Sequence, residues 1–97
     1  MTPLRLIFSD HALQRMFERQ ISPETVREVL ENGEWIEEYP DDSPFPSRLV
    51  VGGHGSRFIH VVAADNPELE ATVVITAYEP DPDQWQQPDF RQRKGSL

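Results

Sequence analysis

The spacing of apolar residues changes at Gly33, and this change constrains the fold more than any other feature of the chain. Before Gly33, apolar residues recur every three to four positions, which is typical of helices that bury one face. After it, long segments rich in β-branched and aromatic residues have a period of two, which predicts strands. Helices followed by a run of strands indicate an α+β domain.

Two helices are predicted before the change. The first begins at a cap on Ser9 or Asp10, and the second begins at Ser22 with Pro23 in its first position, where a missing N–H has no cost. We expect Gly33 to end the second helix in the left-handed conformation. The apolar faces of these helices contain Ala12, Leu13, Met16 and Phe17 in the first, and Val26, Val29 and Leu30 in the second.

Four strands are predicted after the change, over residues 34–39, 48–53, 57–65 and 70–79. The last two should pair as a hairpin through the turn at 66–68. In the predicted strand over residues 34–39, Trp35, Glu37 and Tyr39 should share one face because strands have a period of two. An earlier run through Leu4, Leu6 and Phe8 has the period of an edge strand.

These elements predict a single domain over residues 1–97. A helical hairpin (9–32) packs on one face of a four-stranded antiparallel sheet (34–79), and the other face stays partly open. Residues 80–97 form a polar tail that only Trp85 and Phe90 help to order.

The composition excludes several classes of protein. With no cysteine, the chain has neither a disulfide framework nor a thiolate zinc site, and its three histidines lack the spacing of a metal motif. We therefore expect no metal and no cofactor. No apolar run is long enough to span a membrane and the first residues do not resemble a signal peptide, which favours a cytoplasmic protein. The net charge of −8 opposes non-specific binding to nucleic acid.

Charge is unevenly distributed along the chain. Residues 28–42 hold seven acids and no base, and residues 65–83 hold six acids and no base. Such acidic stretches can recruit a basic partner, or they can form a solvated surface that aids solubility.

The two longest predicted strands place candidate catalytic residues on the open face. If Ile59, Val61 and Ala63 face the helices together with Val73, Ile75 and Ala77, then His60, Thr76 and Tyr78 share the opposite side. An imidazole, a hydroxyl and a phenol on one surface can perform acid–base chemistry near pH 7. The same side chains can instead cover the sheet and bond to one another or to water.

The first helix carries a second candidate, because His11, Arg15 and Arg19 are spaced four residues apart and share one polar strip. Guanidinium groups bind phosphate in a bidentate manner, so the strip can recognise an anion. Alternatively it is an ordinary solvated face on which Glu18 compensates Arg15.

The motifs "DHALQRMFERQIS", "PETVREVLENGEWIEEYPDD", "SRFIHVVAA" and "VVITAYEPDPDQW" together resemble the DUF4258 family, from about Phe8 to Trp85. The resemblance implies a fold of the group that contains RelE-like, barnase-like and colicin-nuclease-like toxins. It also implies metal-independent RNA cleavage, with RNA or the ribosome as target and an antitoxin protein as partner.

The family pattern falls on six positions, which the resemblance implies form the site: His11, Arg15, Arg19, His60, Thr76 and Tyr78. His11 or His60 would serve as base and acid, the arginines would hold the phosphate, and Tyr78 would orient a hydroxyl or stack on a base. Two alternatives stay open. The chain could be a catalytically inactive, acidic protein-interaction module, or it could bind a small anionic metabolite through the same arginines.

Overall fold

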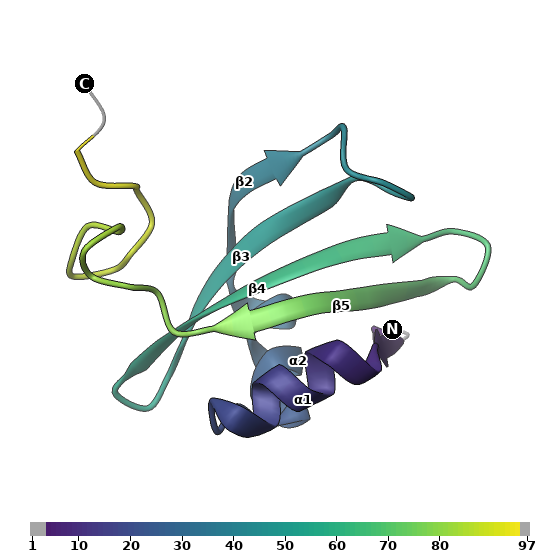
Figure 1. The fold of residues 1–97 in the computed structure, drawn as a ribbon, viewed down its shortest axis with the longest axis horizontal. Helices are drawn as coiled ribbons and strands as arrows, with labels where there is room; N and C mark the ends of the chain where they lie inside the picture. The colour runs from purple at the N-terminus through teal and green to yellow at the C-terminus, as the bar shows by residue number, and fades with distance from the viewer. Residues whose placement is uncertain (1–3, 96–97) are drawn as a thin grey trace.

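The computed structural model describes residues 4–95, which form two helices and five strands. In chain order these are β1 (Leu6–Phe8), α1 (Asp10–Glu18), α2 (Pro23–Asn32), β2 (Glu34–Tyr39), β3 (Ser47–His54), β4 (Arg57–Asn66) and β5 (Ala71–Tyr78). The strands make one sheet in the order β1-β5-β4-β3-β2, and both helices lie against one side of it (Figure 1). The α+β class and the placement of the helices on one face are confirmed.

The four predicted strands are present as β2 to β5 and pair antiparallel, but four is too few for the sheet, because β1 adds a fifth strand that runs parallel to β5. Leu6 lies opposite Thr72 and Phe8 lies opposite Val74, whereas the other neighbouring strands are antiparallel. β1 is three residues long, and its partner is the last strand of the chain. A run of three residues does not indicate with which strand it pairs, least of all when that strand lies more than 60 residues later in the sequence. Residues 1–3 and 96–97, which belong to the predicted domain over 1–97 and, at its end, to the predicted tail, lie outside the described residues.

Both helices begin where the sequence predicts. The Ser9 hydroxyl accepts a hydrogen bond from the Ala12 N–H at 3.0 Å, and the Ser22 hydroxyl accepts one from the Thr25 N–H at 3.1 Å. Each cap satisfies a backbone donor that the first helical turn leaves free.

The left-handed conformation expected at Gly33 is wrong. Gly33 is extended, with φ −82° and ψ −175°. Glycine is needed there for space, since a Cβ atom would collide with the carbonyl oxygens of Val29 and Val51.

The core lies between the helices and the sheet, and only part of the predicted face of α1 enters it. Ala12 and Met16 are buried, whereas Leu13 is 42% exposed and Phe17 is 86% exposed. Leu13 and Phe17 each follow a buried residue by one position, which turns them about 100° away from the sheet. They line an open apolar hollow of about 980 Å³ beside the start of α2. The sheet side of the core consists of Val50, Ile59, Val61, Ala63, Val74 and Ala77.

An irregularity in β5 changes which of its residues face the helices. Val62 pairs with Thr76, but the next residue, Ala63, pairs with Val74, so Ile75 is an extra residue in β5. Val74 is therefore fully buried in the core, while Ile75 is 38% exposed. The predicted core positions of Val73 and Ile75 are wrong because such a bulge reverses the alternation of faces on one side of it.

A second irregularity separates Trp35 from Glu37 on β2. Trp35 pairs with Val50, and Glu37 pairs with the adjacent Leu49. Adjacent residues of a strand point to opposite faces, so Trp35 lies on the face that the helices pack against (the helix face), and Glu37 lies on the opposite face. The prediction that they share a face is wrong.

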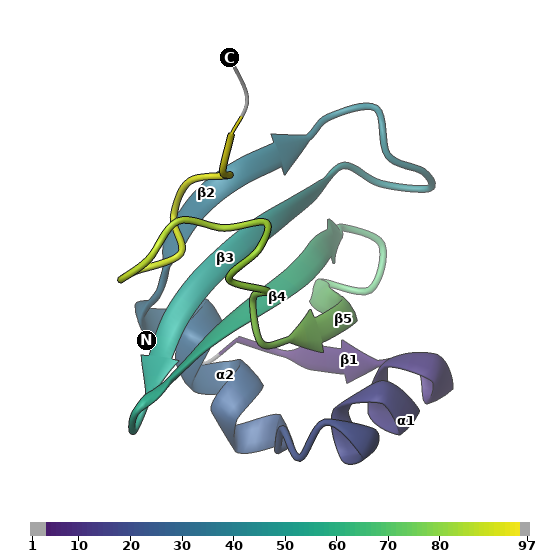
Figure 2. The same cartoon turned by 60° about the vertical axis from the view of Figure 1, so that its left-hand side comes forward.

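Residues 80–95 form a C-terminal segment that runs along the opposite face of the sheet beside β2, β3 and β4 (Figure 2). Trp85 is its anchor, being only 2% exposed, and Phe90 packs edge-on against Phe58 of β4 at 5.5 Å between ring centroids. This segment covers the part of the sheet that holds His60. Among residues 4–95, no helix is both long and apolar enough to cross a membrane.

Candidate functional site

His60 and Tyr78 are direct neighbours on the opposite face of the sheet. They occupy paired positions of β4 and β5, and the Nδ1 atom of His60 lies 3.4 Å from the Tyr78 hydroxyl oxygen. Their rings meet edge to face at 5.4 Å between centroids. The hairpin of β4 and β5 thus brings together an imidazole and a phenol that are 18 residues apart in the chain.

The C-terminal segment encloses His60 and fixes its hydrogen-bonding state. Trp85 meets the imidazole edge to face at 4.6 Å, and the Nε2 atom lies 2.9 Å from the carbonyl oxygen of Phe90. A carbonyl can only accept, so Nε2 carries the proton and Nδ1 presents a lone pair to the Tyr78 hydroxyl. His60 has no exposed surface, and this burial lowers its pKa below the usual 6.5. The imidazole is therefore neutral at pH 7.

Tyr78 is the member of this pair that reaches solvent. Its side chain is half-buried, whereas that of His60 is wholly covered. Burial raises the pKa of Tyr78 above 10, so its hydroxyl stays protonated and is available as a donor. Any proton that His60 exchanges with a bound molecule would pass through this hydroxyl.

Arg19 lies at the free edge of β5, next to Thr76. The β1–β5 pairing extends only from Thr72 to Val74, which leaves the edge of β5 open beyond that point. The Nη1 atom of Arg19 donates to the Ala77 carbonyl at 2.8 Å and lies 3.4 Å from the Thr76 hydroxyl. Because these two bonds use one nitrogen, the remaining guanidinium donors can bind an anion.

Arg57 positions Arg19, a role that the sequence does not reveal. Its guanidinium donates to the carbonyl oxygens of Arg19 at 3.2 Å and Gln20 at 3.0 Å, and it pairs with Glu79. These bonds satisfy carbonyls that the end of α1 leaves free, and they tie that end to β4.

The structure does not bring His11 and Arg15 into this group. Both are exposed on α1, and Arg15 forms an ion pair with Glu18 at 3.5 Å. Across residues 4–95, no side-chain hydrogen bond or ion pair joins either of them to Arg19, His60 or Tyr78; Arg15 is linked to Arg19 only through the backbone bond at the end of α1. The predicted strip is therefore divided, with Arg19 fixed against β5 and Arg15 compensated within its own helix.

The sequence does not reveal a charged pair beside His60, formed by Glu37 and Arg93. Glu37 of β2 accepts two hydrogen bonds from Arg93 of the C-terminal segment, at 2.7 and 2.9 Å, and one from the Tyr39 hydroxyl at 2.7 Å. The bond from Arg93 is the main cause that lowers the pKa of Glu37. The sequence pattern that could have indicated this contact is charge, because the acids of β2 and the basic residues 91–94 have opposite sign. Arg91 of the same segment likewise pairs with Glu34 of β2 at 2.9 Å.

The assembled residues, which we call the edge cluster, are Arg19, Thr76, Tyr78 and His60. They combine a fixed cation at the free edge of β5, two hydroxyls on β5 itself and a neutral imidazole on the neighbouring β4. Within the described residues, no group of three or more histidine or acidic side chains is arranged to hold a metal ion. A guanidinium beside a hydroxyl is suited to binding an anion, and a phenol in contact with a neutral imidazole is suited to moving a proton.

Comparison with known proteins identifies the family of the chain. No curated protein and no solved structure matches it. The model of one family, described as a domain of unknown function (DUF4258), matches residues 8–79, which is more than half of the chain and includes all four residues of the edge cluster. The chain therefore belongs to the DUF4258 family.

Proposed function

We propose that this chain is a metal-independent endoribonuclease of a bacterial toxin–antitoxin system, acting through the edge cluster. The observation that carries the proposal is the contact of Tyr78 with the neutral His60 beside the partly free guanidinium of Arg19. Two helices on one face of a mainly antiparallel sheet are compatible with the RelE-like toxin group that the resemblance implies. RNA, free or on the ribosome, and an antitoxin protein are the partners that the same resemblance supplies.

The chemistry is attack of a ribose 2′-hydroxyl on the adjacent phosphorus. The 2′-oxygen bonds to phosphorus and the bond to the 5′-oxygen breaks, which leaves a cyclic phosphate. Tyr78 takes the 2′-proton as its own proton passes to Nδ1 of His60, and water protonates the departing 5′-oxygen. Imidazolium His60 then returns its proton to solvent through Tyr78.

Arg19 supplies the charge that this reaction needs. Negative charge builds up on the phosphate oxygens in the transition state, and a guanidinium that is already held in place stabilises it without reorganising. The Ala77 carbonyl and the Thr76 hydroxyl hold Arg19, and the bonds from Arg57 hold the helix end that carries it. Arg19 binds substrate in this scheme, while Thr76 and Arg57 are positioning residues.

Inducible expression in a bacterial host tests the proposal, whether the RNA is free or on a ribosome. Wild-type protein should arrest growth and fragment cellular RNA, and the Tyr78→Phe variant, expressed to the same level, should do neither. Growth without arrest and intact RNA would contradict the proposal and favour the inactive interaction module. Stabilisation of purified protein by nucleotides or inorganic phosphate, again without cleavage, would instead indicate a binder of small anions.

A further inference from the structure

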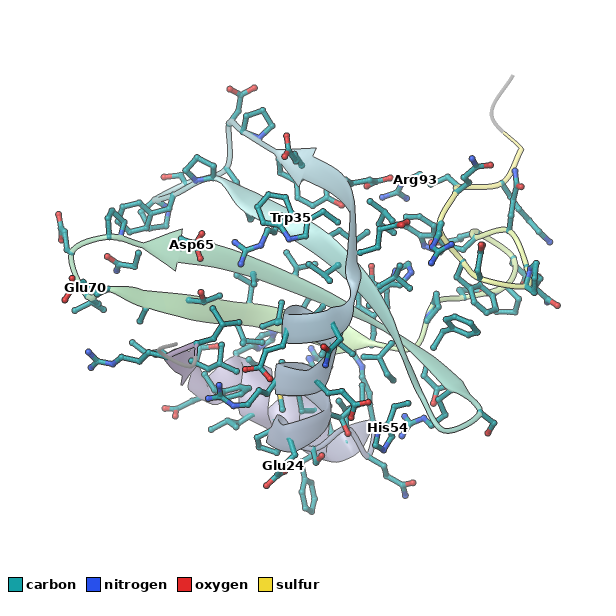
Figure 3. All side chains as sticks on the ribbon, turned by 180° about the vertical axis from the view of Figure 1, so that it is seen from behind. Glu24, Trp35, His54, Asp65, Glu70 and Arg93 are labelled. Atoms are coloured by element: carbon teal, nitrogen blue, oxygen red, sulfur yellow. The ribbon has the colours of Figure 1, made fainter. Side chains whose placement is uncertain are left out.

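Trp35 is a large apolar side chain that the fold leaves uncovered. It lies on β2 at the edge of the sheet, on the helix face, and it is 55% exposed. It borders a hollow of about 330 Å³ whose other walls include Glu38, Arg48 and Asp65. Figure 3 shows Trp35 and Asp65 close to one another above the upper end of α2. An exposed tryptophan in a concave site is typical of a binding surface.

One side of the indole is already occupied and held in place. The guanidinium carbon of Arg48 lies 4.6 Å from the centroid of the Trp35 ring, within the range of a cation–π interaction. The Arg48 side chain is only 11% exposed, and Asp65 neutralises it at 3.2 Å. The indole is therefore fixed before any partner arrives, and its remaining surface faces solvent.

The charges around this hollow select a cationic partner. Glu38 and Asp65 border it, and Arg48, its one basic lining residue within the described chain, is paired. Seven acids and no base occur in residues 28–42, which include β2 and the start of the loop after it. Nucleic acid would be repelled by these carboxylates, whereas a lysine or arginine would be attracted by them and by the ring.

The protein already uses the same combination on its other face. Arg93 lies 4.6 Å from the centroid of Trp85 and pairs with Glu37, so a tryptophan, an arginine and an acid meet there as they do at Trp35. Figure 3 shows Arg93 apart from Trp35, on the C-terminal segment. Trp85 is buried by its interactions, whereas Trp35 retains half of its surface for a second cation.

We propose that Trp35, with Glu38 and Asp65, is a docking site for a basic polypeptide segment of a partner protein. The site seats one lysine or arginine side chain on the uncovered part of the indole, while Asp65 holds Arg48 and Glu38 pairs with a neighbouring positive charge. It lies on the helix face of β2 and uses none of the edge cluster, so it stands whether or not the chain cleaves RNA.

Titration of the full-length ¹⁵N-labelled protein with an octalysine peptide at about 0.15 M salt tests this site. The chain has two tryptophans and hence two indole N–H signals. The Trp35 signal should move and saturate, while that of buried Trp85 should stay. Trp35→Leu and Glu38→Gln should each weaken binding roughly two- to fivefold, the range of one exposed cation–π contact or ion pair. Glu24→Gln, which removes an equal charge at the start of α2, should leave affinity unchanged.

Three results would overturn the site. A Trp35 signal that does not move shows that the peptide binds elsewhere. Equal weakening by Glu38→Gln and Glu24→Gln, with none by Trp35→Leu, shows diffuse attraction to a protein of charge −8. Movement of the Trp35 signal by a single-stranded RNA in place of the peptide shows a nucleic-acid surface.

Discussion

The imidazole of His60 lies between two oxygen atoms of different character, the Phe90 carbonyl at 2.9 Å from Nε2 and the Tyr78 hydroxyl at 3.4 Å from Nδ1. The carbonyl requires a proton on Nε2, so the hydroxyl must be the donor to Nδ1. We predict that His60 is the Nε2–H tautomer at pH 7, to be measured from its ¹⁵N ring shifts. A proton on Nδ1 would show that Phe90 does not set the state of the ring.

The covered position of His60 should make folding stability depend on pH. Burial lowers its pKa in the folded protein below the 6.5 of the unfolded chain, so the unfolded state binds more protons in mildly acidic solution. The contribution of neutral His60 is complete above about pH 6.5 and is lost as the pH falls below that value. Urea unfolding between pH 7.5 and 5 should show stability falling toward acid.

The matched variant for this measurement is His60→Gln, which cannot titrate. Its free energy of unfolding should change less between pH 7.5 and 5 than that of the wild type. A second decrease, common to both proteins, is expected only below the usual pKa of 4.5 for Glu37, whose pKa is lowered in the folded state. Equal slopes between pH 7.5 and 5 would exclude His60 as the source.

Trp85 should matter to stability far more than its place in a polar tail suggests. It is 2% exposed and contacts His60 and Arg93, so Trp85→Ala should destabilise the protein by about 3–5 kcal/mol. Chemical denaturation measures this loss, and Trp35→Ala, at a half-exposed tryptophan, is the comparison. If both substitutions cost the same, the C-terminal segment does not pack on the sheet in solution.

Gly33 should tolerate no side chain. A Cβ atom there would meet the carbonyl oxygens of Val29 and Val51, so Gly33→Ala should destabilise by roughly 1–3 kcal/mol. At Gly53 the nearest atom to an added Cβ is 3.9 Å away, and Gly53→Ala should change stability by less than about 0.5 kcal/mol. Thermal unfolding of the two variants compares them directly, and equal melting temperatures would contradict the role of space at Gly33.

The parts of the fold that could be predicted are those whose signals are local. Ser9 and Ser22 cap helices because a hydroxyl reaches a backbone donor three residues away, and sequence alone contains that relationship. The pairing of β4 with β5 likewise follows from two adjacent β-rich runs and a turn. His60 and Tyr78 could be expected on one face for this reason.

The features that could not be predicted depend on distant or irregular contacts. The bulge at Ile75 and the irregularity between Trp35 and Glu37 each reverse a face, and neither has a glycine or proline to mark it. The bond between His60 and Phe90 uses a backbone carbonyl, and since every residue has one, the sequence cannot show which carbonyl His60 meets. Arg19 differs from Arg15 because it bonds to the edge of β5 that β1 leaves open, and β5 is far from α1 in the sequence.

Cleavage of a labelled single-stranded RNA by purified protein in EDTA, with Tyr78→Phe as the variant and Tyr39→Phe as its matched control, tests the central claim most directly. Each substitution removes one hydroxyl from a half-buried tyrosine on the same face of the sheet, but only the Tyr78 hydroxyl contacts His60. We predict cleavage by the wild type and by Tyr39→Phe, with a rate about 10²-fold or more lower for Tyr78→Phe. No cleavage by the wild type, or an equal rate for Tyr78→Phe, would contradict the account.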